Sequence, residues 1–133
     1  GRLHLGRSRN DQVLAALRLW MRAEAAALAG LAREVAAALG EVARLHDGVA
    51  LPGYTHLQPA MPSSVPLWAG GFAAELEDDA AGLAACARRI EKNPLGSAAG
   101  YGTPGLALDR EAPRAALGFA AVHEPVPMGL AAG

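Results

Sequence analysis

Apolar residues recur at alternating steps of three and four between residues 11 and 46, which is the spacing of an amphipathic helix. One heptad register collects ten positions in two series, and nine of the ten are apolar. The two series are Leu14, Met21, Leu28, Val35 and Val42, and Leu17, Glu24, Leu31, Ala38 and Leu45. The pattern predicts one long helix packed in a bundle or coiled coil. Gly30 and Gly40 each weaken a helix by about 1 kcal/mol relative to alanine, so a kink or an end at Gly40 stays open.

Residues 47–64 form a connection, because prolines within them forbid a continuous helix. A second helix is predicted to begin at Ser63 or Ser64 as its cap, with Pro66 in the first turn. Its expected core stripe is Trp68, Phe72, Leu76, Ala80, Leu83, Ala87 and Ile90. We interpret the acidic run within residues 75–79 as a solvated face.

Residues 93–105 are predicted to form a second loop, and residues 109–117 a short capped helix. The loop contains a GxGxxG string, but no strand precedes it and Pro104 lies inside it, so we reject dinucleotide binding. A loop whose N–H groups approach an anionic ligand and a plain connector both remain open. The predicted fold class is all-α, with two long helices, a short helix, and loops rich in glycine and proline.

The composition supports packed helices, since 52% of the 133 residues are hydrophobic and only 5% are aromatic. The net charge is -1, and basic and acidic residues are interspersed along the sequence. The sequence therefore gives no sign of a basic surface that would bind nucleic acid or an anionic membrane. The single cysteine, Cys86, fits a reducing, cytoplasmic compartment and is expected in the core. The four histidines show no metal-ligand spacing, so no metal site is expected. Because the chain begins inside a motif at Gly1, we expect residues 1–133 to be a single partial domain truncated at both ends.

Two polar clusters, at residues 8–11 and 53–58, interrupt the apolar pattern. The serine, asparagine and aspartate of the first cluster are residue types that accept hydrogen bonds from the free N–H groups of a helix's first turn. Such a start is also an anion site, to which Arg9 adds a planar fork of donors that matches a carboxylate. An ordinary capped helix with a solvated arginine is the alternative.

The length of the first predicted helix limits how the two clusters can meet. A helix unbroken from Asp11 to His46 is roughly 54 Å long. The ten residues Asp47–His56 span at most about 33–36 Å when fully extended. His56 therefore cannot return to Asn10 in the same chain. If the clusters form one site, that site is shared with an antiparallel copy, unless a sharp turn at a glycine breaks the helix.

Three short blocks stand in a specific order and spacing. They are LHLGRSRNDQ at residues 3–12, PGYTHLQ at 52–58, and PLGS at 94–97 followed by LDRE at 108–111. These blocks resemble the argininosuccinate lyases, a family of the fumarase/aspartase superfamily, over a stretch that ends near Phe119. Arg9 between serine and asparagine is the form of this family, where fumarases and aspartases carry serine. Tyr54 before Thr55 and His56 points the same way, because the other relatives usually carry arginine there.

The resemblance implies a long-helix bundle that assembles as a homotetramer, with each active site built from three chains. It implies the reversible elimination of argininosuccinate to L-arginine and fumarate in arginine biosynthesis, by acid–base catalysis, with no cofactor. The residues that it places at the substrate are Ser8, Arg9, Asn10, Thr55 and Gln58. It makes His56, with Thr55, the catalytic pair, His56 being the acid–base residue, while His4 and Gln58 support the others.

Several departures limit the resemblance. Pro59 stands where many relatives have arginine, and the family's mobile loop with a catalytic serine is not in the sequence. We therefore expect a central fragment that is inactive alone. Three alternatives remain. One is another superfamily lyase that acts on adenylosuccinate, malate or aspartate. A second is a non-catalytic helical assembly protein on the same scaffold, in the manner of the family's lens crystallins. The third, a simple coiled-coil module, explains the heptads but not the polar blocks.

Overall fold

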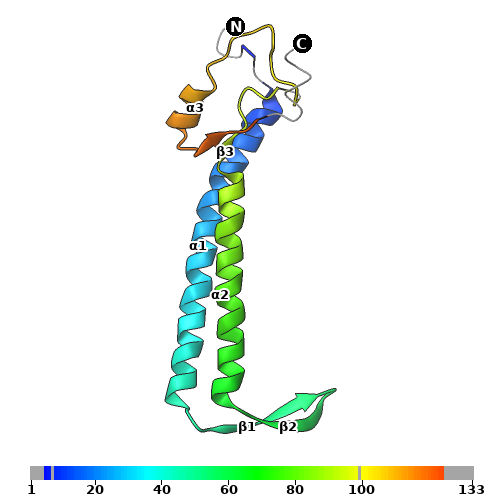
Figure 1. The fold of residues 1–133 in the computed structure, drawn as a ribbon, viewed down its shortest axis with the longest axis vertical. Helices are drawn as coiled ribbons and strands as arrows, with labels where there is room; N and C mark the ends of the chain where they lie inside the picture. The colour runs from blue at the N-terminus through cyan, green and yellow to red at the C-terminus, as the bar shows by residue number, and fades with distance from the viewer. Residues whose placement is uncertain (1–4, 7, 99, 125–133) are drawn as a thin grey trace. The chain divides into compact units, whose positions relative to one another are not determined.

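The computed structural model describes residues 5–6, 8–98 and 100–124, which are mainly helical. The elements in chain order are α1 (Arg9–Leu45), β1 (Ala50–Thr55), β2 (Gln58–Ser64), α2 (Val65–Ile90), β3 (Lys92–Asn93), α3 (Glu111–Ala116) and β4 (Ala121–Val122) (Figure 1). The predicted class, with two long helices and a short third one, is confirmed, and short strands stand where loops were expected. The chain divides into two compact units, residues 1–24 with 87–133 and residues 25–86, which are described separately.

The first long helix, α1, is continuous over 37 residues, as the periodicity predicted. Ser8 caps it, because its Oγ accepts a hydrogen bond from the Asn10 N–H at 3.2 Å. Neither Gly30 nor Gly40 ends the helix, and a Cβ built at either glycine meets no other described atom within 4 Å. The open alternative of an early end at Gly40 is thereby removed.

In the unit of residues 25–86, the fully buried positions of the two long helices are all alanine. Here α1 and α2 run antiparallel and side by side (Figure 1), and Arg33 Nε lies 4.0 Å from Glu77 Oε2. The most deeply buried residues of this unit are Ala29, Ala36, Ala69 and Ala80, each 0–4% exposed. Short side chains let helix backbones approach closely, so the contact depends on shape rather than on large apolar groups.

The leucine-rich heptad series of α1 does not form a core within one chain. Leu28, Leu31 and Val35 are 51%, 56% and 50% exposed. The buried alanines at positions 29 and 36 follow positions 28 and 35 by one residue, or about 100° around the helix. The helix therefore has two apolar faces, and within the single chain only the alanine face is buried.

The second helix, α2, begins where the sequence predicted. Ser64 Oγ accepts a hydrogen bond from the Leu67 N–H at 3.2 Å, and Pro66 lies in the first turn, where its missing N–H costs nothing. The acidic residues at positions 75 and 77–79 are exposed, as expected of a solvated face.

The predicted core stripe of α2 is correct only in its later part. Ala80 is fully buried, and the later members Leu83, Ala87 and Ile90 are partly buried. Trp68 and Phe72, in contrast, are 51% and 55% exposed and pack edge to face on each other, with ring centroids 5.6 Å apart. Cys86, which we expected in the core, is also exposed, because it lies off the alanine face.

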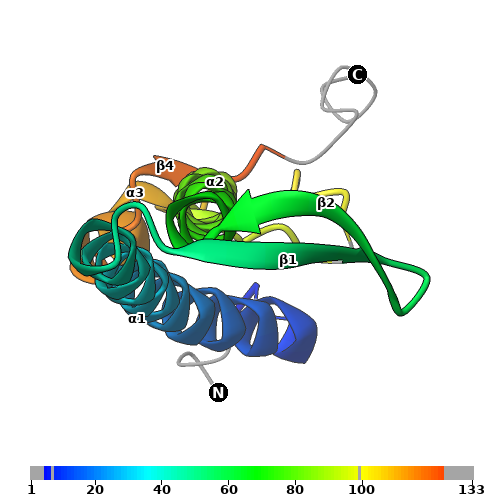
Figure 2. The same ribbon diagram turned by 90° about the horizontal axis from the view of Figure 1, so that it is seen from below.

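The connection between the long helices is a β-ribbon rather than an irregular loop. Strands β1 and β2 pair in antiparallel register from Ala50 opposite Ser64 to Thr55 opposite Gln58 (Figure 2). The prolines argued against strands in the sequence, because proline donates no hydrogen bond to a ladder and is not found in central strands. In a two-stranded ribbon each strand has an open edge, where proline is tolerated.

In the unit of residues 1–24 and 87–133, the packing centres on the buried side chain of Asn93. Asn93 Nδ2 donates to the Arg110 carbonyl at 3.1 Å, and its Oδ1 accepts from the Leu95 N–H at 3.1 Å. Its carbonyl accepts from the His123 N–H at 2.8 Å and so holds β4 parallel to β3. A fully buried amide with partners on three segments keeps all of its polar groups satisfied.

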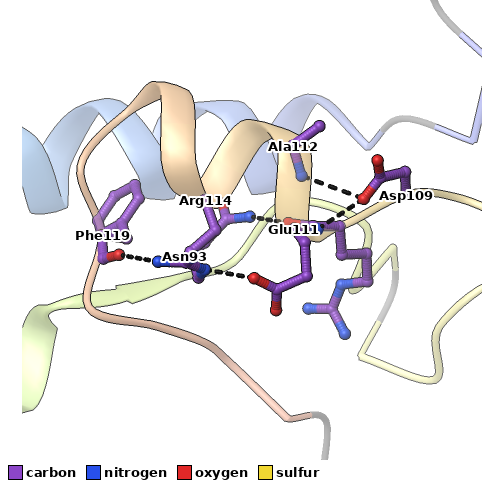
Figure 3. A network of polar contacts seen from close by, with 7 residues as sticks. Asn93, Asp109, Glu111, Ala112, Arg114 and Phe119 are labelled. Atoms are coloured by element: carbon purple, nitrogen blue, oxygen red, sulfur yellow. Dashed lines mark hydrogen bonds and ion pairs between the residues drawn. The ribbon is translucent and has the colours of Figure 1, made fainter.

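The short helix α3 is capped, as the sequence predicted. Asp109 Oδ1 accepts hydrogen bonds from the N–H groups of Glu111 and Ala112 at 3.0 and 3.1 Å (Figure 3). From within α3, Arg114 Nη1 donates to the carbonyl of Phe119, which follows the helix, at 3.0 Å. The Phe119 ring, 2% exposed, fixes the following segment in this unit.

The Arg110 side chain lies against the backbone of Gly96. A Cβ at Gly96 would lie 3.0 Å from the Cγ, Cδ and Nε of Arg110, and the glycine has a φ of +85°. Gly96 is therefore required twice, by its left-handed backbone and by the arginine that covers it.

We expect Gly96→Ala to lower the free energy of unfolding by roughly 1–3 kcal/mol. Gly102→Ala is the matched control, since Gly102 has a φ of +75° and no described atom near its missing Cβ. Urea unfolding should give the larger loss at position 96. Equal losses at both positions would contradict the close packing of Arg110.

His123 should make this unit less stable in acid. Burial, then the charges of Arg18, Lys92 and Arg110, lower the pKa of His123, and Glu124 opposes them. The unfolded chain therefore binds the proton more readily than the folded chain does. The contribution of neutral His123 to the free energy of unfolding is complete above the unfolded pKa of about 6.5, and it is lost as the pH falls through the lower folded pKa.

Replacing His123 by glutamine should flatten the fall in stability between about pH 7 and pH 5, as followed by urea unfolding at each pH. His46→Gln, at an exposed histidine, is the control. A steep loss that persists in His123→Gln would assign it to other groups.

Candidate functional site

The first candidate block, Ser8-Arg9-Asn10, forms the start of α1. The Ser8 hydroxyl is used as the helix cap and is partly buried, whereas Arg9 and Asn10 are exposed. The first-turn N–H groups of a helix carry a partial positive charge. The block thus presents a guanidinium and an amide beside a helix terminus, which is a combination that suits a carboxylate.

The second candidate block, Thr55-His56 with Gln58, forms the tip of the ribbon. Thr55 ends β1 and pairs with Gln58, the first residue of β2, so His56 and Leu57 are the two residues of the turn. All four side chains are exposed. The ribbon therefore places His56 in the turn that joins Thr55 to Gln58.

The turn at the tip has an unusual backbone. His56 and Leu57 have φ values of +50° and +63°, as in a two-residue type I′ turn, where glycine and asparagine are normally preferred. A left-handed leucine is rare, and Leu57 is 94% exposed, so its side chain gains no burial in return. Such conformations cluster at functional sites, where they aim a neighbouring side chain.

Each candidate block is assembled locally, and the two blocks belong to different units of the chain. Ser8, Arg9 and Asn10 are neighbours on one turn, and Thr55, His56 and Gln58 are neighbours on one ribbon tip. His4 lies outside the described residues. The positive φ of Leu57 could not be predicted from the sequence, because leucine gives no sign of a left-handed turn.

Several backbone N–H groups of the glycine-rich loop are hydrogen-bonded within the chain. The Ser97 carbonyl accepts hydrogen bonds from Gly100 and Gly102 at 2.8 and 3.0 Å, and the Ser97 N–H donates to the Pro94 carbonyl. The Ala98 N–H donates to Asp11 Oδ2 at 2.8 Å. These N–H groups are engaged within the chain, which favours the connector over an anion-binding loop.

The described residues also bear on metal binding and on membrane insertion. In residues 5–6, 8–98 and 100–124, no three His, Cys, Asp or Glu side chains gather where they could hold a metal ion. Over the same residues, neither long helix has a stretch apolar enough to cross a bilayer.

Comparison with known proteins identifies the family. The family described as Lyase matches residues 1–128. A protein named argininosuccinate lyase from Phocaeicola vulgatus is 48% identical over 118 residues, which are 89% of this chain and 26% of that protein. One from Haloarcula marismortui is 44% identical over 124 residues, which are 93% of this chain and 25% of that protein.

A solved structure supports the same assignment. EDDS lyase in complex with formate superposes with a TM-score of 0.82 at 29% identity, over 92% of this chain and 24% of that one. The chain thus spans about a quarter of the length of the relatives it matches. With a family match over nearly its whole length and helices arranged as in a solved relative, this chain belongs to the lyase family.

Proposed function

We propose that the chain carries two of the substrate-contacting blocks of an argininosuccinate lyase, which converts argininosuccinate to L-arginine and fumarate. The observation that carries the proposal is the exposed ribbon tip, where His56 is held at a φ of +50° between Thr55 and Gln58. Identities of 44–48% to proteins of that name, against 29% to EDDS lyase, favour this substrate over others used in the superfamily.

The elimination needs two proton transfers. A base removes a proton from the carbon beside a carboxylate, and the electron pair of that C–H bond becomes the second bond of the fumarate double bond. The C–N bond breaks, and the guanidino nitrogen leaves with a proton as arginine. His56 serves one of these transfers, since a histidine exchanges protons near neutral pH and the turn exposes it.

The carboxylates of the substrate require fixed donors. Removal of the proton drives negative charge onto the neighbouring carboxylate, and donors already aimed at that group stabilise it. Arg9 and Asn10 supply such donors from the first turn of α1, with Ser8 beside them. Thr55 supplies a hydroxyl next to His56, and Gln58 supports the turn from the paired position.

The two blocks work together in sites shared between subunits. A helix of 37 residues is about 55 Å long, and the eleven residues from His46 to His56 reach at most about 40 Å. Blocks at the start of α1 and beyond its end therefore meet only between copies of the chain. The exposed series that includes Leu28, Leu31 and Val35 is suited to that assembly, which we propose is a homotetramer.

The proposed setting is the cytoplasm, because a single cysteine in 133 residues suits a reducing compartment. The proposed partners are the small-molecule substrate and other copies of the chain. The proposed chemistry uses side chains alone, without a cofactor.

In the full-length protein, we expect His56→Asn to lower kcat for argininosuccinate by roughly 10²–10⁴-fold, because the amide cannot transfer a proton. The assay follows the ultraviolet absorbance of fumarate. His46→Asn, at an exposed histidine near the end of α1, is the control and should keep the wild-type rate. An unchanged rate in His56→Asn would refute the assigned role. A wild-type protein that releases no fumarate would refute the proposed substrate.

A further inference from the structure

We infer that Arg110 is a positioning residue for the Ser8–Asn10 block, acting through the loop Pro94–Ala98 and Asp11. The inference rests on the proposed function, because it concerns how the carboxylate-binding block is held. It links the PLGS and LDRE blocks of the sequence, for which the proposed chemistry has no use, to the start of α1.

The link to the binding block is the Asp11 carboxylate. Asp11 directly follows Asn10 in the first turn of α1 and is 6% exposed. Its Oδ2 accepts a hydrogen bond from the Ala98 N–H at 2.8 Å, across 87 positions of sequence. A bond from a buried carboxylate to a backbone N–H is charge-assisted and directional, so the position of Ala98 determines the position of this turn.

The loop cannot hold that position by its own backbone preference. Ala98 has a φ of +50°, a left-handed conformation that costs a non-glycine residue free energy. Gly96 on the other side of Ser97 has a φ of +85°. Glycine adopts this conformation without strain, so the cost lies at Ala98, whose position needs support from other residues.

Arg110 supplies this support with three hydrogen bonds. Its Nε donates to the Leu95 carbonyl at 2.9 Å, and its Nη2 donates to Ser97 Oγ at 3.2 Å and to the His123 carbonyl at 2.7 Å. Its methylene groups cover Gly96. The planar fork of arginine reaches several acceptors from one rigid group, which a lysine ammonium cannot reproduce.

The consequence for function follows from the exposure of Arg9 and Asn10. Both side chains are exposed, so the helix turn that bears them sets their direction. Binding groups must be held to within about 0.5 Å of the productive geometry. Loosening the loop would let this turn of the helix shift. The shift would weaken the binding of the substrate carboxylates, whereas it would slow the proton transfer at His56 much less.

The test compares Arg110→Gln with Arg114→Gln in the full-length protein. Arg114 is a matched control, because its hydrogen bonds go to the Phe119 carbonyl and to Glu111, which both lie outside the loop. We expect Arg110→Gln to raise KM for argininosuccinate about 10–100-fold with a much smaller change in kcat. Arg110→Lys should not restore KM, and Arg114→Gln should leave KM unchanged.

A second pair of variants tests the same link should Arg110→Gln fail to fold. Asp11→Asn keeps an oxygen acceptor for the Ala98 N–H and should retain most of the substrate affinity, whereas Asp11→Ala should raise KM as Arg110→Gln does. The double variant Asp11→Ala/Arg110→Gln should lose little more than either single one, because both remove one connection. Additive losses, or equal KM values for Asp11→Asn and Asp11→Ala, would overturn the inference.

Hydrogen exchange separates this inference from the proposed function. The Ala98 amide should exchange faster in Arg110→Gln than in wild type or Arg114→Gln. One outcome is that the wild-type protein does not act on argininosuccinate while the Ala98 amide still exchanges faster in Arg110→Gln than in wild type. In that case the proposed substrate is wrong and the structural link stands. If wild type is active and Arg110→Gln changes neither KM nor exchange at Ala98, the inference fails alone.

Discussion

The structure depends on one helix, α1, that has two apolar faces. Only one of these faces is buried within the chain. The alanine face of α1 is buried at Ala29 and Ala36, in the unit that it shares with α2. The leucine face remains about half exposed from Leu28 to Val35. Burial of apolar area is the main favourable term in folding and association, so a continuous leucine face is unfavourable in an isolated chain. The proposed assembly removes this conflict and at the same time brings the two polar blocks together.

The positions of the proposed functional residues depend on short polar segments rather than on the apolar faces. A serine cap begins α1 at the block proposed to bind carboxylates, and a two-residue turn with left-handed backbone carries His56. Asn93 and Arg110 hold the loop that contacts Asp11. In each case short-range backbone geometry or a few hydrogen bonds set the position of the residues concerned.

The sequence predicted the long helices well, because their signals are local. The period of apolar residues, the caps Ser8 and Ser64, and the tolerance of Pro66 in a first turn depend only on neighbouring residues. The sequence could not show which face of α1 is buried in one chain, because heptad spacing identifies large apolar residues and does not identify their partner. It also failed on the ribbon, since strand pairing across prolines depends on which strand edges are open.

The candidate site could be predicted in part. The residue types at Ser8–Asn10 and Thr55–Gln58 marked both blocks, and the structure adds how each block is formed. The contact of Ala98 with Asp11 joins residues 87 positions apart, and neither residue type indicates it, so only the three-dimensional structure could show it. The left-handed backbone of Leu57 likewise follows from the ribbon register rather than from the residue itself.

Mixing two inactive variants tests whether the two blocks act together from different subunits. In the full-length protein, His56→Asn disables one block and Arg9→Ala disables the other. Each variant alone should therefore release little fumarate from argininosuccinate. After refolding together, mixed oligomers should contain some sites with both blocks intact, and activity should return in the mixture only. If the two chains form mixed oligomers, as capture by a tag on one of them would show, and no activity returns, the shared site is contradicted.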